Sequence, residues 1–180
     1  MTLSESGLLF PEAPHAPDRD TLLRDLGLTG PDPDLDAFAQ QMAHEAGVPY
    51  GMVNIFRTQQ QCFDGLCTPG EDSELPTVGR SMALTAGFCP EVVETGLARV
   101  HPDLYASRDL ASNEVVDILD ARTYAGAPLI HVGHVLGTVC FLGPEPRGQE
   151  TGRPTLHMIK SKRDELLVML LRRSGFNVRQ

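Results

Sequence analysis

Long apolar runs are absent from the sequence. The longest, Leu166 to Leu171, has six residues, whereas a membrane-spanning helix needs about 20. A secretory signal peptide would show a basic start followed by an apolar stretch, and the first residues lack that pattern. We therefore expect a cytoplasmic protein that has no membrane partner and whose mature chain begins near Met1.

Basic residues are scarce as well. Lys and Arg total 15 against 24 Asp and Glu, and the net charge of −9 disfavours nucleic acid as a partner. The imbalance is uneven, because residues 1–36 carry eight acids and two bases whereas residues 151–180 carry two acids and seven bases. We expect these two segments to attract each other, either within one chain or between two chains.

Cysteine is rare, and the common motifs of catalysis are missing. Cys62 and Cys67 have a spacing that zinc tolerates, but no second pair of ligands accompanies them, so free buried thiols are the favoured interpretation. The sequence has no glycine-rich phosphate loop, no Gly-x-Ser-x-Gly motif and no two histidines on one helical face. These observations predict no metal site and identify no enzyme class.

The sequence does contain enough apolar residues for the core of one domain, with 41% hydrophobic residues in a chain of 180. Helices are expected at residues 20–28, 35–46, 110–121 and 154–173, with a shorter one beginning near Cys89. Strands are expected at residues 48–56, 61–66, 98–101, 122–130 and 134–142. This order indicates an α+β fold around an antiparallel sheet.

The last two expected strands contain residues that are unusual in strands. Gly126 and Pro128 lie in the first of them, and Gly137 lies in the second. Because glycine and proline both weaken the hydrogen-bond ladder, we expect a bulge or a close backbone approach here. The small side chains leave room either for a ligand or for tight packing, and both remain open.

Several segments resemble the GAF domain family and occur in that family's order. They are Val48-Pro-Tyr50 with Met52-Val-Asn-Ile55, Gly87-Phe-Cys-Pro-Glu-Val-Val93, Pro102-Asp103 with Asn113-Glu-Val-Val116, the segment 122–129, and the segment 135–141 with Glu145-Pro-Arg147. The similarity covers roughly residues 35–147 and is that of a stand-alone bacterial GAF protein.

The resemblance implies a central antiparallel sheet flanked by helices, with the N- and C-terminal helices packed on one face. We accordingly divide the chain into an N-terminal arm and short helix (1–34), a GAF-like domain (35–147), and a C-terminal helix and tail (148–180). Within the first segment, residues 1–17 hold three prolines and are expected to be a loosely docked arm.

GAF domains are mostly sensory modules that bind a small molecule between the sheet and its covering loops and helices. By this resemblance, the candidate ligand-binding residues are Asn54, Arg80, Phe88, Cys89, Asp103, Tyr105, Asp109, Tyr124 and Thr138. We expect a non-catalytic regulatory module that binds a small ligand or a protein partner and signals through a separate protein. A ligand-free interaction scaffold is an alternative.

The family's subtypes leave the cofactor unknown. A covalent bilin would need Cys followed by His, and haem would need an axial His, which neither His44 nor His101 is well placed to supply. The signature of cyclic-nucleotide binders is absent. A thiol-dependent reductase of the free methionine sulfoxide type remains an alternative, because Cys89 at a helix start would have a lowered pKa, although a carboxylate at Glu91 would raise that pKa.

The last helix has an apolar seam formed by Leu156, Ile159, Leu166 and Leu170. An apolar stripe of this width needs a cover. We expect a homodimer through the terminal helices, and the alternative is that the N-terminal helix covers the seam within one chain.

Overall fold

The computed structural model describes residues 17–175. Its helices are α1 (Arg19–Asp25), α2 (Pro33–Ala46), α3 (Cys89–Thr95), α4 (Arg108–Ala111), α5 (Glu114–Leu119) and α6 (Gly152–Arg173), with 3-10 turns η1 (Leu104–Ala106) and η2 (Gln149–Thr151). Its strands are β1 (Tyr50–Phe56), β2 (Gln60–Cys67), β3 (Ser81–Ala83), β4 (Arg99–His101), β5 (Thr123–His131) and β6 (His134–Gly143). Apart from Pro17, the expected arm over residues 1–17 lies outside the described residues.

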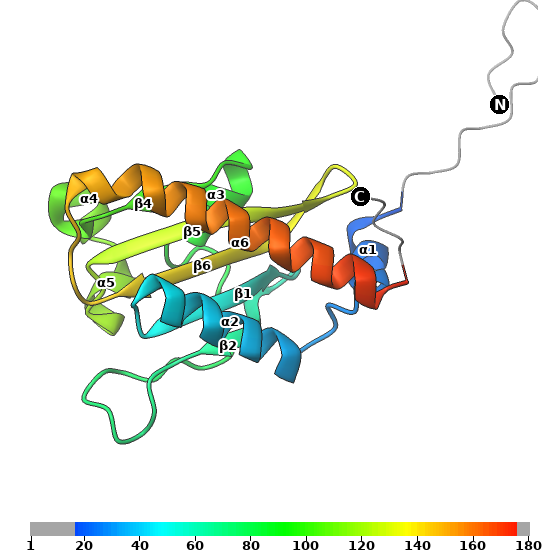
Figure 1. Cartoon of the computed structure of the whole chain (residues 1–180), viewed down its shortest axis with the longest axis horizontal. Coiled ribbons are helices and arrows are strands. Elements are labelled where there is room, and N and C mark those ends of the chain that lie inside the picture. The colour runs from blue at the N-terminus through cyan, green and yellow to red at the C-terminus, as the bar shows by residue number, and fades with distance from the viewer. Residues whose placement is uncertain (1–16, 176–180) are drawn as a thin grey trace, which may run out of the picture.

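Within residues 17–175, six strands form one sheet in the order β3-β2-β1-β6-β5-β4, and neighbouring strands are antiparallel. Figure 1 shows α2 and α6 crossing one face of this sheet, with α3, α4 and α5 on the other. Helix α1 packs with α2 and α6 on the first face. The predicted α+β fold, with terminal helices on one face, is therefore confirmed.

The buried apolar residues of the described chain form one cluster on each face of the sheet. Val53 and Ile55 of β1 belong to the cluster beneath α2 and α6, whereas Met52 and Phe56 belong to the cluster beneath α3 and α5. This alternation is the one expected from the sequence, since successive strand residues point to opposite faces. Helices cover both faces, so every residue of β1 is buried.

Two helix boundaries differ from the expected ones for local reasons. Helix α2 begins at Pro33 rather than at residue 35, because the side chain of Asp32 accepts a hydrogen bond of 2.8 Å from the backbone N–H of Asp34, and proline is tolerated in the first turn. The single helix expected over residues 110–121 is two short helices, α4 and α5, since Asn113 breaks the segment and caps α5. The three-residue edge strand β3 was not predicted.

The hairpin of β5 and β6 forms as expected, but its bulge does not lie where the glycine and proline suggested. The pairing register shifts between Leu129 and Ile130. A side chain at Gly126 would collide with the ring of Tyr124, and one at Gly137 would collide with the backbone carbonyl of Asn54. The expected close backbone approach is therefore found at Gly137, whereas the space beside Gly126 is filled by the Tyr124 side chain rather than left for a ligand.

The apolar seam of α6 is covered within the chain. Ile159, Leu166 and Leu170 are fully buried against the sheet, in the same cluster as residues of α1 and α2. The argument that this seam would form a dimer interface was therefore wrong, because its buried residues pack against the sheet of their own chain. Leu156 is only partly buried.

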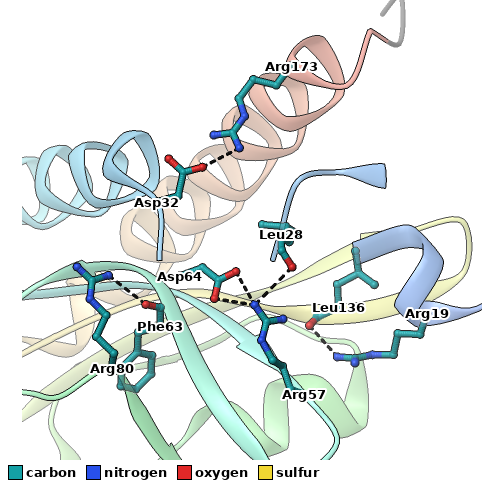
Figure 2. Close-up of polar contacts among 9 residues, drawn as sticks. All are labelled: Arg19, Leu28, Asp32, Arg57, Phe63, Asp64, Arg80, Leu136 and Arg173. Carbon is teal, nitrogen blue, oxygen red and sulfur yellow. Dashed lines mark hydrogen bonds and ion pairs between the residues drawn. The ribbon is translucent and has the colours of Figure 1, made fainter. Parts of the chain in front are cut away.

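Ion pairs join the acidic beginning of the described chain to its basic end. Arg173 of α6 pairs with Asp32 at 2.7 Å and lies 3.8 Å from the carboxylate of Asp34, and Lys162 also pairs with Glu45, just beyond the acidic segment, at 2.7 Å. Figure 2 shows the Arg173 pair bridging the end of α6 and the start of α2. The attraction expected from charge is thus realised within one chain.

Arginines also tie the N-terminal segment to the sheet. Arg57 pairs with the buried carboxylate of Asp64 at 2.8 Å and donates to the carbonyl of Leu28 at 3.4 Å, while Arg19 donates to the carbonyl of Leu136 at 2.8 Å (Figure 2). These contacts hold α1 and the following loop against the β1–β2 and β5–β6 hairpins. Across residues 17–175, no helix combines the length and apolarity needed to cross a membrane.

Candidate functional site

Five of the nine predicted site residues meet in the layer between the sheet and α3. Asn54 comes from β1, Tyr124 from β5 and Thr138 from β6, while Cys89 begins α3 and Phe88 immediately precedes it. All five are buried. A cavity of about 20 Å³ is lined by four of them, Asn54, Phe88, Cys89 and Tyr124, together with Gln61, Cys140 and apolar side chains of β1, β2 and α5, whereas Thr138 is not part of the lining.

The thiol of Cys89 is surrounded by polar groups. Thr138 Oγ1 donates to Cys89 Sγ over 3.2 Å, and Tyr124 Oη lies 3.3 Å from the same sulfur. Hydrogen bonding with the adjacent Cys140 thiol, followed by that with Thr138 and Tyr124, lowers the pKa of Cys89 to about 7 against the opposing effect of burial. Hydrogen bonds to the charged form favour ionisation, so Cys89 is the acidic member of this pair.

Cys140 has the opposite character. Its interaction with Cys89 and its burial raise the pKa of its thiol well above the usual value. The Cys140 sulfur also lies 3.8 Å from Met52 Sδ, a soft and weak acceptor. Two neighbouring thiols therefore differ in acidity, with the proton retained on Cys140 while Cys89 ionises.

A chain of amides sets the orientation of Asn54. Gln61 Nε2 donates to the carbonyls of Ala83 and Ala86 at 2.7 and 2.8 Å, which leaves Gln61 Oε1 to accept from Asn54 Nδ2 at 2.7 Å. The remaining oxygen, Asn54 Oδ1, has no hydrogen-bond partner among the described residues, although Asn54 is only 1% exposed. An unsatisfied buried acceptor costs about 1–3 kcal/mol, so its presence beside a cavity points to a ligand that would donate to it.

Aromatic rings pack beside the thiols. The Phe88 ring centroid lies 5.2 Å from that of Tyr124 and 5.9 Å from that of His101. Burial raises the pKa of the Tyr124 hydroxyl well above its usual range, which keeps it protonated as a donor. Burial lowers the pKa of His101, so this ring contributes a neutral wall rather than a charge.

Four predicted site residues lie elsewhere. Arg80 pairs with Asp36 of α2 at 2.7 Å. It also donates to the carbonyl of Phe63 at 3.2 Å, as Figure 2 shows. Asp103 pairs with Arg122 at 3.0 Å, and the Arg122 guanidinium lies 3.9 Å from the ring centroid of Tyr105, which is 53% exposed. Asp109 is exposed in the first turn of α4. None of these four residues lines the cavity.

Glu91 does not act on Cys89 as expected. It pairs with Arg99 of β4 at 3.1 Å on the surface, and the pKa of Cys89 is lowered rather than raised. The expectation failed because Glu91 does not line the cavity, whereas the hydroxyls of Thr138 and Tyr124 contact the sulfur.

Sequence reasoning missed two residues of this site, Gln61 and Cys140. Both belong to expected strands, and the general expectation of free buried thiols assigns Cys140 no role in a site. The available signal was alternation along β6, which places Cys140 on the same face as Thr138. For Gln61, the signal was its polar side chain on β2, the strand that pairs with the fully buried strand β1.

The geometry of this site suits the binding of a very small molecule or a reaction at a thiol. Typical small-molecule pockets have volumes of about 300–1,000 Å³, whereas this cavity has about 20 Å³. Its lining offers one free acceptor on Asn54, the hydroxyl of Tyr124, and two thiols of unequal acidity. The described residues contain no group of three or more His, Cys, Asp or Glu side chains suited to hold a metal ion.

Comparison with solved structures shows what the fold is similar to. The phycocyanobilin-bound GAF domain from a cyanobacterial phytochrome is 12% identical, with a TM-score of 0.63 over 90% of this chain and 98% of that one. The GAF domain from Acinetobacter phosphoenolpyruvate-protein phosphotransferase is 10% identical, with a TM-score of 0.59 over 87% and 92%. The type II free methionine-R-sulfoxide reductase from Thermoplasma acidophilum is also 10% identical, with a TM-score of 0.58 over 77% and 91%.

These identities are low, so the structural matches establish the fold and nothing finer. No curated protein sequence matches the chain significantly. The model of the GAF domain family matches residues 31–160, which is well over half of the sequence. The chain is therefore a member of the GAF domain family.

Proposed function

We propose that this protein is a sensory or regulatory module that receives a small molecule in the cavity around Asn54 and Cys89 and passes the signal to a separate protein. The observation that carries the proposal is the unpaired Asn54 Oδ1, which the Gln61 amide holds in place beside the cavity. A ligand with an N–H or O–H donor would satisfy this oxygen. Membership of a family rich in sensory modules supports the same function.

The size of the cavity limits the ligand. A volume of about 20 Å³ exceeds the roughly 10–15 Å³ that one water-sized molecule requires, and it excludes a bilin or a nucleotide in this conformation. A bulkier ligand would require α3 and α5 to move away from the sheet. These helices have only seven and six residues, so each contributes little apolar contact of its own.

Ligand binding can be tested by thermal unfolding of the full chain with small polar compounds that carry N–H or O–H donors. We expect at least one compound to raise the unfolding temperature of the wild type and of Gln40→Leu, an exposed α2 variant on the other face, but not of Asn54→Leu. Native mass spectrometry of the purified chain would detect a bound compound directly. A compound that stabilised Asn54→Leu equally would contradict the role of Asn54, and the failure of all compounds would favour the ligand-free scaffold.

A second candidate is a thiol-dependent reductase, and the pairing of Cys89 with Cys140 favours it. The lowered pKa of Cys89 suits an attacking thiolate, and a neighbouring thiol suits resolution. Free methionine sulfoxide exceeds the present cavity, so turnover would require opening. We expect that, if the chain is such a reductase, Cys89→Ser abolishes turnover of free methionine sulfoxide with a dithiol reductant, while Cys67→Ser retains it.

We also propose a homodimer, although not through the seam first considered. A groove of about 800 Å³ lies between α2 and α6 and is lined by the apolar Ala37, Phe38, Val168 and Met169. Acidic residues of α2 and α6 and the basic end of α6 border it. Both charges occur on one patch, so two copies related by a two-fold axis would present opposite charges to each other.

A further inference from the structure

The two buried thiols of the cavity are brought together by the strand and helix that carry them. Thr138 and Cys140 lie two residues apart on β6 and therefore share one face of the sheet. Cys89, at the start of α3, lies over them and accepts a hydrogen bond from Thr138. Cys89 and Cys140 are 6% and 2% exposed and line the same cavity.

Their surroundings assign different chemical roles. Thr138 and Tyr124 place hydroxyl groups 3.2 and 3.3 Å from Cys89 Sγ, where they stabilise a thiolate. Cys140 faces the thioether of Met52, which offers no such donor. Cys89 is therefore the nucleophile of the pair, and Cys140 is the thiol that can attack it once it is oxidised.

The cavity beside them fits a small oxidant. Its volume of about 20 Å³ admits a molecule little larger than water. Hydrogen peroxide is of that class, and each of its two O–H groups can donate to the unpaired Asn54 Oδ1. Methionine sulfoxide and organic hydroperoxides with bulky substituents are too large for this space.

We propose that Cys89 and Cys140 form a peroxide-reactive pair that closes to a disulfide inside the cavity. The inference rests on the proposed function, because it names hydrogen peroxide as the input of the same site. It differs from reversible ligand binding in leaving a covalent product.

The chemistry balances in two steps. The Cys89 thiolate attacks one oxygen of hydrogen peroxide, the O–O bond breaks, and hydroxide leaves and takes up a proton as water, so that Cys89 becomes a sulfenic acid. The Cys140 sulfur then attacks the Cys89 sulfur, the S–O bond breaks, the S–S bond forms, and the oxygen leaves as a second water with the Cys140 proton. Two thiols are oxidised by two electrons, and one hydrogen peroxide is reduced to two waters.

The product would alter the cover of the sheet. A disulfide between Cys89 and Cys140 would tie the start of α3 to the central strand β6 and remove the thiolate that Thr138 and Tyr124 stabilise. Arg99 links α3 to β4 through Glu91 on the surface. Oxidation of the buried thiols would therefore change the position of α3, whose Glu91 side lies on the surface.

Peptide mapping of the full chain tests the inference. The reduced protein is treated with equimolar hydrogen peroxide, and the remaining thiols are alkylated with N-ethylmaleimide before digestion and mass spectrometry. We expect a linked Cys89–Cys140 peptide, with Cys62 and Cys67 still alkylated. A Cys62→Ser/Cys67→Ser variant, which removes the two partly exposed thiols, serves as the matched control and should form the same disulfide.

Single variants assign the order of events. Cys140→Ser should stop at a sulfenic acid on Cys89 that dimedone traps, and Cys89→Ser should leave Cys140 reduced. Alkylated Cys89 in the peroxide-treated wild type, or a sulfenic acid that forms first on Cys140, would overturn the inference. Ligand binding that depends on Asn54 without disulfide formation would refute this inference alone, whereas the loss of both would refute the proposed function as well.

Discussion

At the residue scale, the site depends on hydrogen bonds that only strand geometry explains. Asn54 and Gln61 are diagonal neighbours on β1 and β2: the antiparallel register pairs Asn54 with Phe63 and Phe56 with Gln61, and the two amide side chains hydrogen-bond across the strands. Gln61 Nε2 donates both of its N–H groups to the carbonyls of Ala83 and Ala86. Gln61 can therefore only accept from Asn54, through Asn54 Nδ2, and this arrangement leaves Asn54 Oδ1 unpaired and available to a ligand.

The acidity of Cys89 leads to a pH prediction. Because its pKa is lowered to about 7, the thiolate should be lost as the pH falls through about 7 and fully formed well above it. The groups facing it are Cys140, Thr138, Tyr124 and Asn54. The ultraviolet absorbance of the thiolate against pH, taken as the difference between the wild type and Cys89→Ser, measures this ionisation.

Removal of one donor should shift that curve. Thr138→Val deletes the hydroxyl that donates to Cys89 Sγ at 3.2 Å, and a hydrogen bond to a charged group contributes about 1.5 kcal/mol or more. We expect the pKa of Cys89 to rise by about one unit, which lowers the thiolate fraction at pH 7 roughly fivefold. An unchanged curve in Thr138→Val would show that this hydroxyl does not stabilise the thiolate.

At the scale of elements, the centre of the sheet depends on a close approach of two strands. A Cβ atom at Gly137 would collide with the backbone carbonyl of Asn54 on β1, and backbone cannot move aside as a flexible side chain can. Strand β6 therefore needs glycine here although glycine is a poor strand former.

Gly137→Ala should destabilise the protein for that reason. We expect a loss of about 1–3 kcal/mol in the free energy of unfolding, typical of overpacking, measured by urea denaturation. Gly70→Ala, in a loop position with open space around it, is the matched control and should change stability by less than about 0.5 kcal/mol. Equal stability of the two variants would show that β1 and β6 separate more easily than their contact suggests.

The ion pair between the strand β2 and the β1–β2 turn gives a second prediction at this scale. Asp64 is buried, and desolvation raises its pKa even though Arg57 acts to lower it. Arg57→Met would leave the carboxylate without its partner, and we expect a loss of about 3 kcal/mol at pH 7. Because a carboxyl with a raised pKa favours folding in its protonated form, the loss should shrink as the pH falls towards that pKa.

The double variant Arg57→Met/Asp64→Leu is the informative comparison. It removes both charges, so its stability should return towards that of the wild type. Chemical denaturation at pH 7 and pH 4.5 would measure all three proteins. A double variant as unstable as Arg57→Met would show that the packing of Arg57, rather than the unpaired charge, matters.

At the scale of the whole molecule, the terminal helices are part of the domain core rather than attachments to it. Residues of α1, α2 and α6 share one apolar cluster with the sheet, and Arg173 and Lys162 join α6 to the region of α2. A boundary between residues 147 and 148 thus remains a prediction about sequence organisation, while α6 packs against β4, β5 and β6.

The proposed dimer is a prediction at this scale. Val168→Asp places a charge in the apolar groove between α2 and α6, so the protein should have the mass of a monomer in light scattering. His157→Asp, an exposed position on the same helix outside the groove, should keep the mass of the wild-type dimer. Circular dichroism checks that both variants fold, and a wild-type mass near 19.6 kDa would refute the dimer outright.

Local sequence patterns determined much of the architecture. Alternation in β1, the glycine that ends α2, and the Val132-Gly133 turn of the last hairpin act over a few residues, so their effects could be predicted without the fold. The similarity of several segments to one family then ordered these elements. Short pieces such as β3 escaped prediction because three residues carry too little periodicity, and tertiary pairing with β2 forms the strand.

The tertiary structure alone decided which polar residues share a site. Sequence placed Arg80, Asp103, Tyr105 and Asp109 in covering loops and helices, but it contains no signal for the face to which a loop turns its side chains. Each of these residues lies on the surface or forms an ion pair away from the cavity. The meeting of Cys89 with Cys140 depends on how α3 docks on β6, which is a long-range event. Backbone propensity acts locally, whereas the chemistry of this protein depends on contacts between distant segments.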